Sequence, residues 1–115
     1  MTRILCIEDE AALREDIVEE LNDAGYETFE AANGSIGYDA ILAHRPDLVL
    51  CDVNMPDMNG YELLTKLRET NEEFDDVPFV FLSALADRKD IIAGKKLGAD
   101  DYLTKPVDFE MLLVT

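Results

Sequence analysis

The sequence of 115 residues contains no tryptophan, only two cysteines and a single histidine. No Cys-x-x-Cys pair and no Cys/His cluster occurs, which argues against a structural zinc site. Cys6 and Cys51 each lie inside an apolar run, so we interpret them as small buried hydrophobic residues. His44 lies near the end of a predicted helix, and a Ser-His-Asp triad is therefore poorly supported.

Basic residues are also scarce: 10 Lys and Arg stand against 26 Asp and Glu, for a formal net charge of −16. A surface this acidic repels phosphate backbones, so we expect no direct binding of nucleic acid by this chain. No segment approaches the roughly 18 apolar residues of a membrane span. The first residues lack the pattern of a signal peptide. Together these absences predict a cytoplasmic protein that does not bind membranes.

What the sequence does contain is a regular alternation of short apolar runs and amphipathic segments. The predicted strands cover residues 3–7, 26–31, 48–51, 79–82 and 101–104, and the predicted helices cover residues 10–24, 35–44, 60–70 and 87–97, with a last one from residue 108. This alternation is typical of βαβ units and a parallel sheet. We therefore predict one α/β domain over residues 1–115.

The predicted fold is flavodoxin-like: an open, doubly wound, five-stranded parallel sheet in a three-layer α/β/α, (βα)5 arrangement. Its expected strand order is 2-1-3-4-5, one of the two common orders of such sheets. Gly25 is expected to end the first helix in the left-handed conformation. Ser35 is expected to cap the second helix. Ile36, Ala40 and Ile41 are expected to face the core. The last helix is cut short at the end of the chain, so we expect any output domain to lie beyond residue 115.

The stretch from Leu48 to Gly60 places a carboxylate at the end of a buried strand. Four apolar residues run from Leu48 to Cys51, which fits a strand covered on both faces, and Asp52 follows them. A proline and an Asn-Gly pair then supply a turn and a helix start. Asp52 is thus expected at the carboxyl end of its strand, where open α/β sheets place their ligands.

Polar residues follow the other strands as well. Glu8 and Asp9 come after the first strand, Ser83 ends the fourth, and Lys105 follows the fifth. Right-handed crossovers bring these strand ends to one edge of the sheet, and strands one and three are neighbours in the predicted order. Glu8, Asp9 and Asp52 should therefore crowd together. Ser83 and Lys105 would lie on the far side of Asp52.

Three carboxylates in one pocket repel one another unless a cation lies among them. A set of oxygen ligands without cysteine or histidine favours Mg²⁺. With Lys105 as a second cation and Ser83 as a hydroxyl donor, the pocket suits phosphoryl transfer to Asp52. Each residue alone has an ordinary interpretation, as a helix N-terminal acid, a turn residue or a surface lysine. Their coincidence at one edge favours a single site.

These residues belong to a set of motifs that strongly resembles the receiver domain of two-component response regulators, including the chemotaxis regulators. The resemblance covers essentially the whole chain. It rests on Glu8-Asp9, on Asp52-Val-Asn-Met-Pro-Asp-Met-Asn-Gly60, on Ser83-Ala84, and on Gly98-Ala-Asp-Asp-Tyr-Leu-Thr-Lys-Pro106.

The resemblance implies a regulatory phosphoprotein in which Asp52 accepts a phosphoryl group from a sensor histidine kinase or a phosphotransfer protein. The reaction would depend on Mg²⁺ bound by Asp52, by Asp9 directly and by Glu8 mostly through water. The backbone carbonyl of Asn54 would complete this set. Such a domain is not an enzyme acting on other substrates, because it catalyses only its own phosphotransfer and autodephosphorylation.

The resemblance also implies how phosphorylation would be transmitted. Ser83 and Lys105 would contact the phosphoryl oxygens, and Tyr102 would be the switch aromatic that turns inward when Ser83 moves. The face formed by the fourth helix, fifth strand and fifth helix would then change and regulate an output domain or a partner protein. The sequence leaves open whether the chain forms homodimers.

Other functions remain as alternatives from the sequence. An aspartyl-phosphate phosphohydrolase of the haloacid dehalogenase type would carry an Asp-x-Asp motif after its first strand. Here the second residue beyond Asp52 is Asn54, which leaves no evident general acid. A degenerate receiver that only binds partners would lack one of the acids or the lysine. A flavin-binding module would be supported by the fold alone, and a fold does not by itself imply a function.

Overall fold

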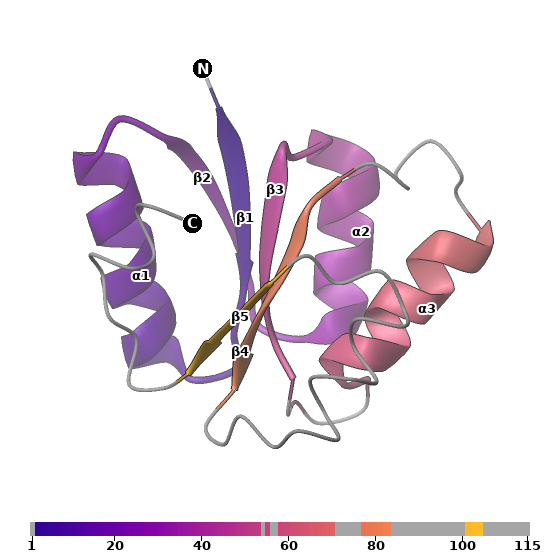
Figure 1. The fold of residues 1–115 in the computed structure, drawn as a ribbon. Helices are drawn as coiled ribbons and strands as arrows, with labels where there is room; N and C mark the ends of the chain where they lie inside the picture. The colour runs from indigo at the N-terminus through magenta and orange to yellow at the C-terminus, as the bar shows by residue number, and fades with distance from the viewer. Residues whose placement is uncertain (1, 54, 56–57, 71–76, 84–100, 105–115) are drawn as a thin grey trace.

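The computed structural model describes residues 2–53, 55, 58–70, 77–83 and 101–104 (Figure 1). In chain order the elements are β1 (Arg3–Ile7), α1 (Ala11–Asp23), β2 (Glu27–Ala31), α2 (Gly34–His44), β3 (Leu48–Asp52), α3 (Gly60–Thr70), β4 (Phe79–Ser83) and β5 (Asp101–Thr104). The helices predicted over residues 87–97 and from residue 108 lie outside the described residues. Within the described part, no helix has the length and apolar character needed to cross a membrane.

The five strands form one parallel sheet in the order β2-β1-β3-β4-β5, which confirms the predicted topology. Ile7 at the end of β1 is paired with Ala31 of β2 and with Cys51 of β3. At the same edge Asp52 is paired with Leu82 of β4. The residues that follow β1 therefore emerge beside the end of β3, as the switch point of this strand order requires.

Helices cover both faces of the sheet, with α1 on one side and α2 and α3 on the other (Figure 1). Because side chains alternate along a strand, successive residues of β1 enter different cores. The core under α2 and α3 includes Leu5, Ile7, Val49, Cys51, Leu63, Leu64, Leu67, Phe79 and Phe81. The core under α1 includes Ile4, Cys6, Ile17, Leu21, Leu50, Val80 and Leu82. Because helices bury both faces of the sheet, these strands are apolar at successive positions.

The start of α2 differs from the prediction. The helix begins at Gly34 and its cap is Asn33, not Ser35, because the Asn33 side chain accepts a hydrogen bond from the Ile36 backbone N–H at 2.9 Å. Ser35 is exposed inside the first turn. An Asn side chain caps a helix as well as Ser does, so residue type alone did not favour Ser35 over Asn33, which lies two residues earlier.

The buried side of α2 also differs from the prediction for one residue. Ile41 is fully buried and Ala40 is half-buried, but Ile36 is 49% exposed. The buried residues of the helix are instead Gly34, Gly37 and Ile41. A Cβ atom at Gly37 would lie 2.6 Å from Cδ1 of Ile7, so only glycine lets the α2 backbone come this close to β1. The contact expected from the Ile36 side chain is therefore made by the backbone at Gly37. Gly25 has φ +96°, as predicted for the end of α1.

Candidate functional site

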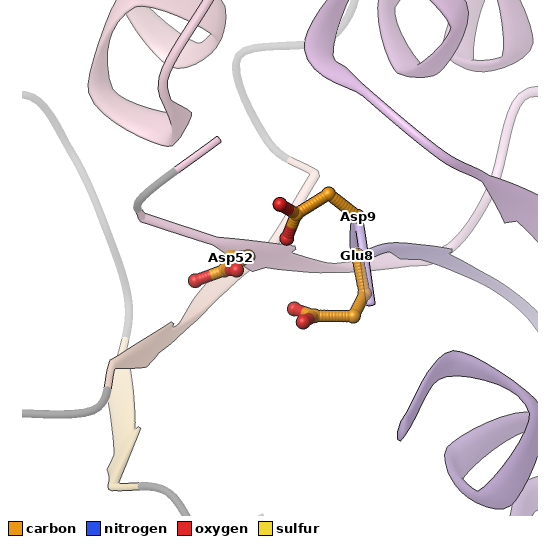
Figure 2. Close-up of side chains that lie close together, drawn as sticks. All are labelled: Glu8, Asp9 and Asp52. Atoms are coloured by element: carbon orange, nitrogen blue, oxygen red, sulfur yellow. The ribbon is translucent and has the colours of Figure 1, made fainter. Parts of the chain in front are cut away.

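Three carboxylates converge at the carboxyl edge of the sheet. Glu8 and Asp9 directly follow β1, and Asp52 is the last residue of β3. One carboxylate oxygen from each residue lies within 4.8 Å of the other two. Figure 2 shows the three side chains directed toward a common space between the two strand ends. The predicted crowding of these acids is confirmed.

The three acids differ in their exposure to solvent. Glu8 is completely buried and Asp52 is 3% exposed, whereas Asp9 is exposed. Burying a carboxylate is costly unless nearby groups or ions compensate its charge. The cluster thus combines two buried acids with one that faces solvent, an arrangement that a cation could reach from outside.

The donor set fits Mg²⁺ on the chemistry of its atoms. All three candidate ligands are carboxylate oxygens, the type that hard divalent cations prefer. The nearby thiols do not compete, because burial, with a smaller contribution from the Glu8 carboxylate, raises the pKa of Cys6 to about 12. Burial and the Asp52 carboxylate also raise the pKa of Cys51 well above its usual value. Protonated thiols do not serve as the thiolate ligands that softer metals need.

Backbone hydrogen bonds hold the β3 side of the site. The N–H of Val53 donates to the Leu82 carbonyl at 3.1 Å, and the N–H of Gly60 donates to the Val53 carbonyl at 2.9 Å. The first turn of α3 is therefore attached directly to the strand end that carries Asp52. A reciprocal pair of hydrogen bonds between Asn59 and Glu62 caps this helix.

The β1 side of the site is held by a residue that sequence reasoning missed. The N–H of Glu8 donates to the Ala31 carbonyl at 3.0 Å, and Nη1 of Arg14 donates to the Glu8 carbonyl at 2.7 Å. Arg14 also forms an ion pair with Glu30, with Nε 3.3 Å from Oε1. The only sequence signal for this role was a lone basic residue among the acids of the first helix.

Two of the remaining predicted site residues, Ser83 and Tyr102, lie on β4 and β5. Ser83 ends β4 and is paired with Thr104 at the end of β5, while Tyr102 is paired with Phe81. Asn54 and Lys105 lie outside the described residues, as do the motif residues 98–100.

The only histidine lies away from this edge and has a packing role. The His44 ring stacks on Phe29 with centroids 4.1 Å apart and an interplanar angle of 13°. Its backbone carbonyl accepts a hydrogen bond from Arg3 at 3.1 Å. Among the described residues, His44 thus joins the end of α2 to β2 and β1.

Known proteins share this sequence pattern. The chain matches the family described as "Response regulator receiver domain" over residues 4–115. It is similar to the DNA-binding dual master transcriptional regulator RpaA of Synechocystis sp., with 38% identity over 113 residues that cover 98% of this chain and 46% of RpaA. It is 37% identical to the response regulator ArlR of Staphylococcus aureus over 113 residues, covering 98% of this chain and 50% of ArlR. The chain spans about half the length of these curated relatives.

Solved structures share the fold. The chemotaxis protein CheY4 of Vibrio cholerae superposes with a TM-score of 0.94 and 32% identity, covering 99% of this chain and 94% of that chain. The receiver domain of the Francisella response regulator 1452 gives a TM-score of 0.90 and 30% identity, covering 99% and 92% of the two chains. The flavodoxin-like arrangement is therefore common to these proteins and this chain.

Proposed function

The chain belongs to the response regulator receiver domains, regulatory components of two-component systems, and we propose that it is a signalling switch phosphorylated on Asp52. The observation that carries this proposal is the convergence of Glu8, Asp9 and Asp52 at the carboxyl edge of the sheet. A sensor histidine kinase or a phosphotransfer protein would supply the phosphoryl group from a phosphohistidine. The domain would cover residues 1–115 and act from the cytoplasm.

The reaction would be a nucleophilic transfer. A carboxylate oxygen of Asp52 attacks the phosphorus, a new O–P bond forms, the N–P bond of the phosphohistidine breaks, and the imidazole nitrogen keeps the bonding electron pair. Asp52 lies at the tip of β3 with 3% exposure, so its position is defined by the sheet. Attack by water on the same phosphorus would return Asp52 to its free form.

Glu8, Asp9 and Asp52 would hold Mg²⁺, together with the backbone carbonyl of Asn54. When bound, Mg²⁺ would supply positive charge that offsets the charge on the phosphoryl oxygens. The chain itself would provide the rest of the site. Its buried Glu8 and exposed Asp9 would orient the cation toward the nucleophile, and the two strand ends would keep that geometry rigid.

Ser83 and Lys105 would contact the phosphoryl oxygens from the β4 and β5 side. The strand register supports this assignment, because Ser83 follows Leu82, the partner of Asp52, and Thr104, the partner of Ser83, precedes Lys105. Movement of Ser83 toward the phosphoryl group would draw Tyr102 inward.

The change at β5 would alter the α4-β5-α5 face, where α4 and α5 denote the predicted helices over residues 87–97 and from residue 108. This face would bind an output domain beyond residue 115 or a separate partner, and a homodimer is one arrangement it could support. Beryllofluoride, a phosphoryl mimic, should shift the amide resonances of Asp101–Thr104. Resonances unchanged after beryllofluoride addition would contradict the switch.

The direct experiment exposes the protein to acetyl phosphate and Mg²⁺ and measures its intact mass. We expect a gain of one phosphoryl group that is absent from Asp52→Asn. The matched control is Asp47→Asn, because Asp47 directly precedes the opposite end of β3 and its carboxylate accepts a hydrogen bond from the Arg3 backbone N–H. This variant should be phosphorylated like the wild type.

The same experiment distinguishes the alternatives. A folded protein that binds Mg²⁺ but gains no phosphoryl group would be a degenerate receiver and would contradict the proposal. Continuous release of phosphate from many phosphorylated substrates would indicate a phosphohydrolase instead.

A further inference from the structure

Arg14 extends from α1 back to the end of β1. Its Nη1 donates to the Glu8 carbonyl at 2.7 Å, and its Nε lies 3.3 Å from Oε1 of Glu30 on β2. Its backbone N–H donates to the Glu10 carbonyl at 3.0 Å, which forms the first turn of α1. With 17% of its side chain exposed, Arg14 is well enclosed for a residue of its type. One side chain thus joins α1, β2 and the residues that follow β1.

The contact with Glu8 restricts the peptide that leads into Asp9. The Glu8 N–H is held by the Ala31 carbonyl and the Glu8 carbonyl is held by Arg14, so both backbone polar groups of Glu8 have defined partners. Because the peptide bond is planar, fixing the Glu8 carbonyl also fixes the direction of the Asp9 N–H. The positions from which the Glu8 and Asp9 side chains project are therefore determined partly by Arg14.

The charge of Arg14 has opposing effects at this position: it pairs with the Glu30 carboxylate, but it would repel a cation bound at the acidic cluster. Arg14 lies near the N-terminal end of α1, where the helix dipole disfavours a cation. A guanidinium close to the carboxylate cluster also opposes the binding of a second cation there. If Arg14 acted only through its charge, its removal would strengthen Mg²⁺ binding. If it acts by holding the backbone, its removal would weaken Mg²⁺ binding.

We propose that Arg14 is a positioning residue for the cation site, acting through the Glu8 carbonyl rather than through its charge. This inference rests on the proposed function, because it assumes that Glu8, Asp9 and Asp52 bind Mg²⁺. The forked guanidinium is needed because Nε and Nη1 bind two different acceptors at once. A lysine can keep the charge but has a single nitrogen with which to reach Glu8 and Glu30.

The chain contains a matched control for this arrangement. Arg3 of β1 and Glu27 of β2 form an ion pair at the end of these strands that lies opposite the acidic edge, with Nε 3.5 Å from Oε2. That pair is far more open, because 48% of the Arg3 side chain and 45% of the Glu27 side chain are exposed. Arg3→Met therefore removes the same charge and another arginine–glutamate ion pair without touching the acidic edge.

The test is calorimetric titration of Mg²⁺ into wild type, Arg14→Met, Arg14→Lys and Arg3→Met, with the fold of each checked by circular dichroism. We expect Arg14→Met to raise the Mg²⁺ dissociation constant by about tenfold or more, the range typical for residues that orient metal ligands. Arg14→Lys should raise it by less, and Arg3→Met should leave it unchanged. If Arg14→Met does not fold, the comparison of Arg14→Lys with wild type decides.

Each outcome has a distinct meaning. Tighter or unchanged Mg²⁺ binding in folded Arg14→Met would overturn the positioning role while leaving the proposed function intact. Equal weakening in Arg3→Met would overturn it as well, because the effect would then not depend on the acidic edge. Wild type that binds no Mg²⁺ would instead contradict the proposed function on which the inference rests.

Discussion

Gly60 packs directly against the backbone of Asp52: a Cβ atom at Gly60 would lie 2.5 Å from the Asp52 carbonyl oxygen and 2.8 Å from Cε1 of Phe81. The N–H of Gly60 also donates to the Val53 carbonyl at 2.9 Å. The first residue of α3 is therefore in contact with the strand end that carries the proposed nucleophile. Any side chain at position 60 must displace either that strand end or the ring of Phe81.

Gly60→Ala is expected to lower the free energy of unfolding by about 1–3 kcal/mol, because the added methyl group overpacks a buried contact. It should also weaken Mg²⁺ binding, since the displaced backbone belongs to Asp52. Urea unfolding and Mg²⁺ titration measure the two effects. Gly25→Ala is the control: its φ of +96° costs roughly 1–2 kcal/mol in an alanine, but no atom other than those of its chain neighbours lies within 4 Å of its Cβ position. Mg²⁺ binding that is weakened in Gly25→Ala but unchanged in Gly60→Ala would contradict this prediction.

Mg²⁺ should stabilise the protein against unfolding through the acidic cluster. At a free concentration of about 100 times the dissociation constant, the expected gain in the free energy of unfolding is about 2.7 kcal/mol. Asp9→Asn should abolish most of this gain, because it removes a charged ligand from an exposed position without disturbing the core. Asp47→Asn, at the other end of the sheet, should keep it. An equal gain in wild type and Asp9→Asn would show that Mg²⁺ binds elsewhere.

The capping of α3 should contribute measurably to stability. Asn59 Oδ1 accepts from the Glu62 N–H at 2.8 Å, and Glu62 Oε1 accepts from the Asn59 N–H at 3.1 Å. Asn59→Ala is expected to cost about 0.5–2 kcal/mol in urea unfolding, as for other helix caps. Asn33→Ala at the start of α2 provides a comparison of the same type, since the Asn33 side chain caps α2 by accepting a hydrogen bond from the Ile36 N–H. Unchanged stability in Asn59→Ala would mean that the reciprocal bonds do not form in solution.

Both thiols should be unreactive in the folded protein. Cys6 and Cys51 have no exposed surface, and the pKa of Cys6 is raised to about 12, so the reactive thiolate is nearly absent at pH 8. An Ellman titration should detect two thiols in urea and none on the same time scale in buffer. A rapidly reacting thiol in the folded state would show that the end of β1 or β3 opens to solvent.

The strand order and the acidic cluster could be predicted because they follow from strong, simple constraints. Parallel strands with right-handed crossovers bring their carboxyl ends to one edge, and in the order 2-1-3-4-5 the acids at the ends of β1 and β3 are neighbours there. The burial of Cys6 and Cys51 followed from the continuous apolar character of the same strands. These features depend on chain connectivity and hydrophobic pattern, which can be read from residue types alone.

Other features depend on how the elements pack and could not be predicted in the same way. Ile36 was expected inside because it is apolar, yet it is exposed, whereas Gly37 is buried and allows the backbone of α2 to approach Ile7 of the sheet. Arg14 was not singled out, because its two acceptors on β1 and β2 become neighbours only after α1 docks. A long side chain that joins three elements leaves no local sequence signature.

The most direct measurement locates the phosphoryl group itself. After reaction with acetyl phosphate and Mg²⁺, reduction with borohydride converts an aspartyl phosphate into homoserine, which peptide mass spectrometry can place in the sequence. Homoserine at position 52, present only when both acetyl phosphate and Mg²⁺ were supplied, is the predicted result. Homoserine at another aspartate, or none in a sample whose intact mass had increased by a phosphoryl group, would contradict the assignment of Asp52 as the nucleophile.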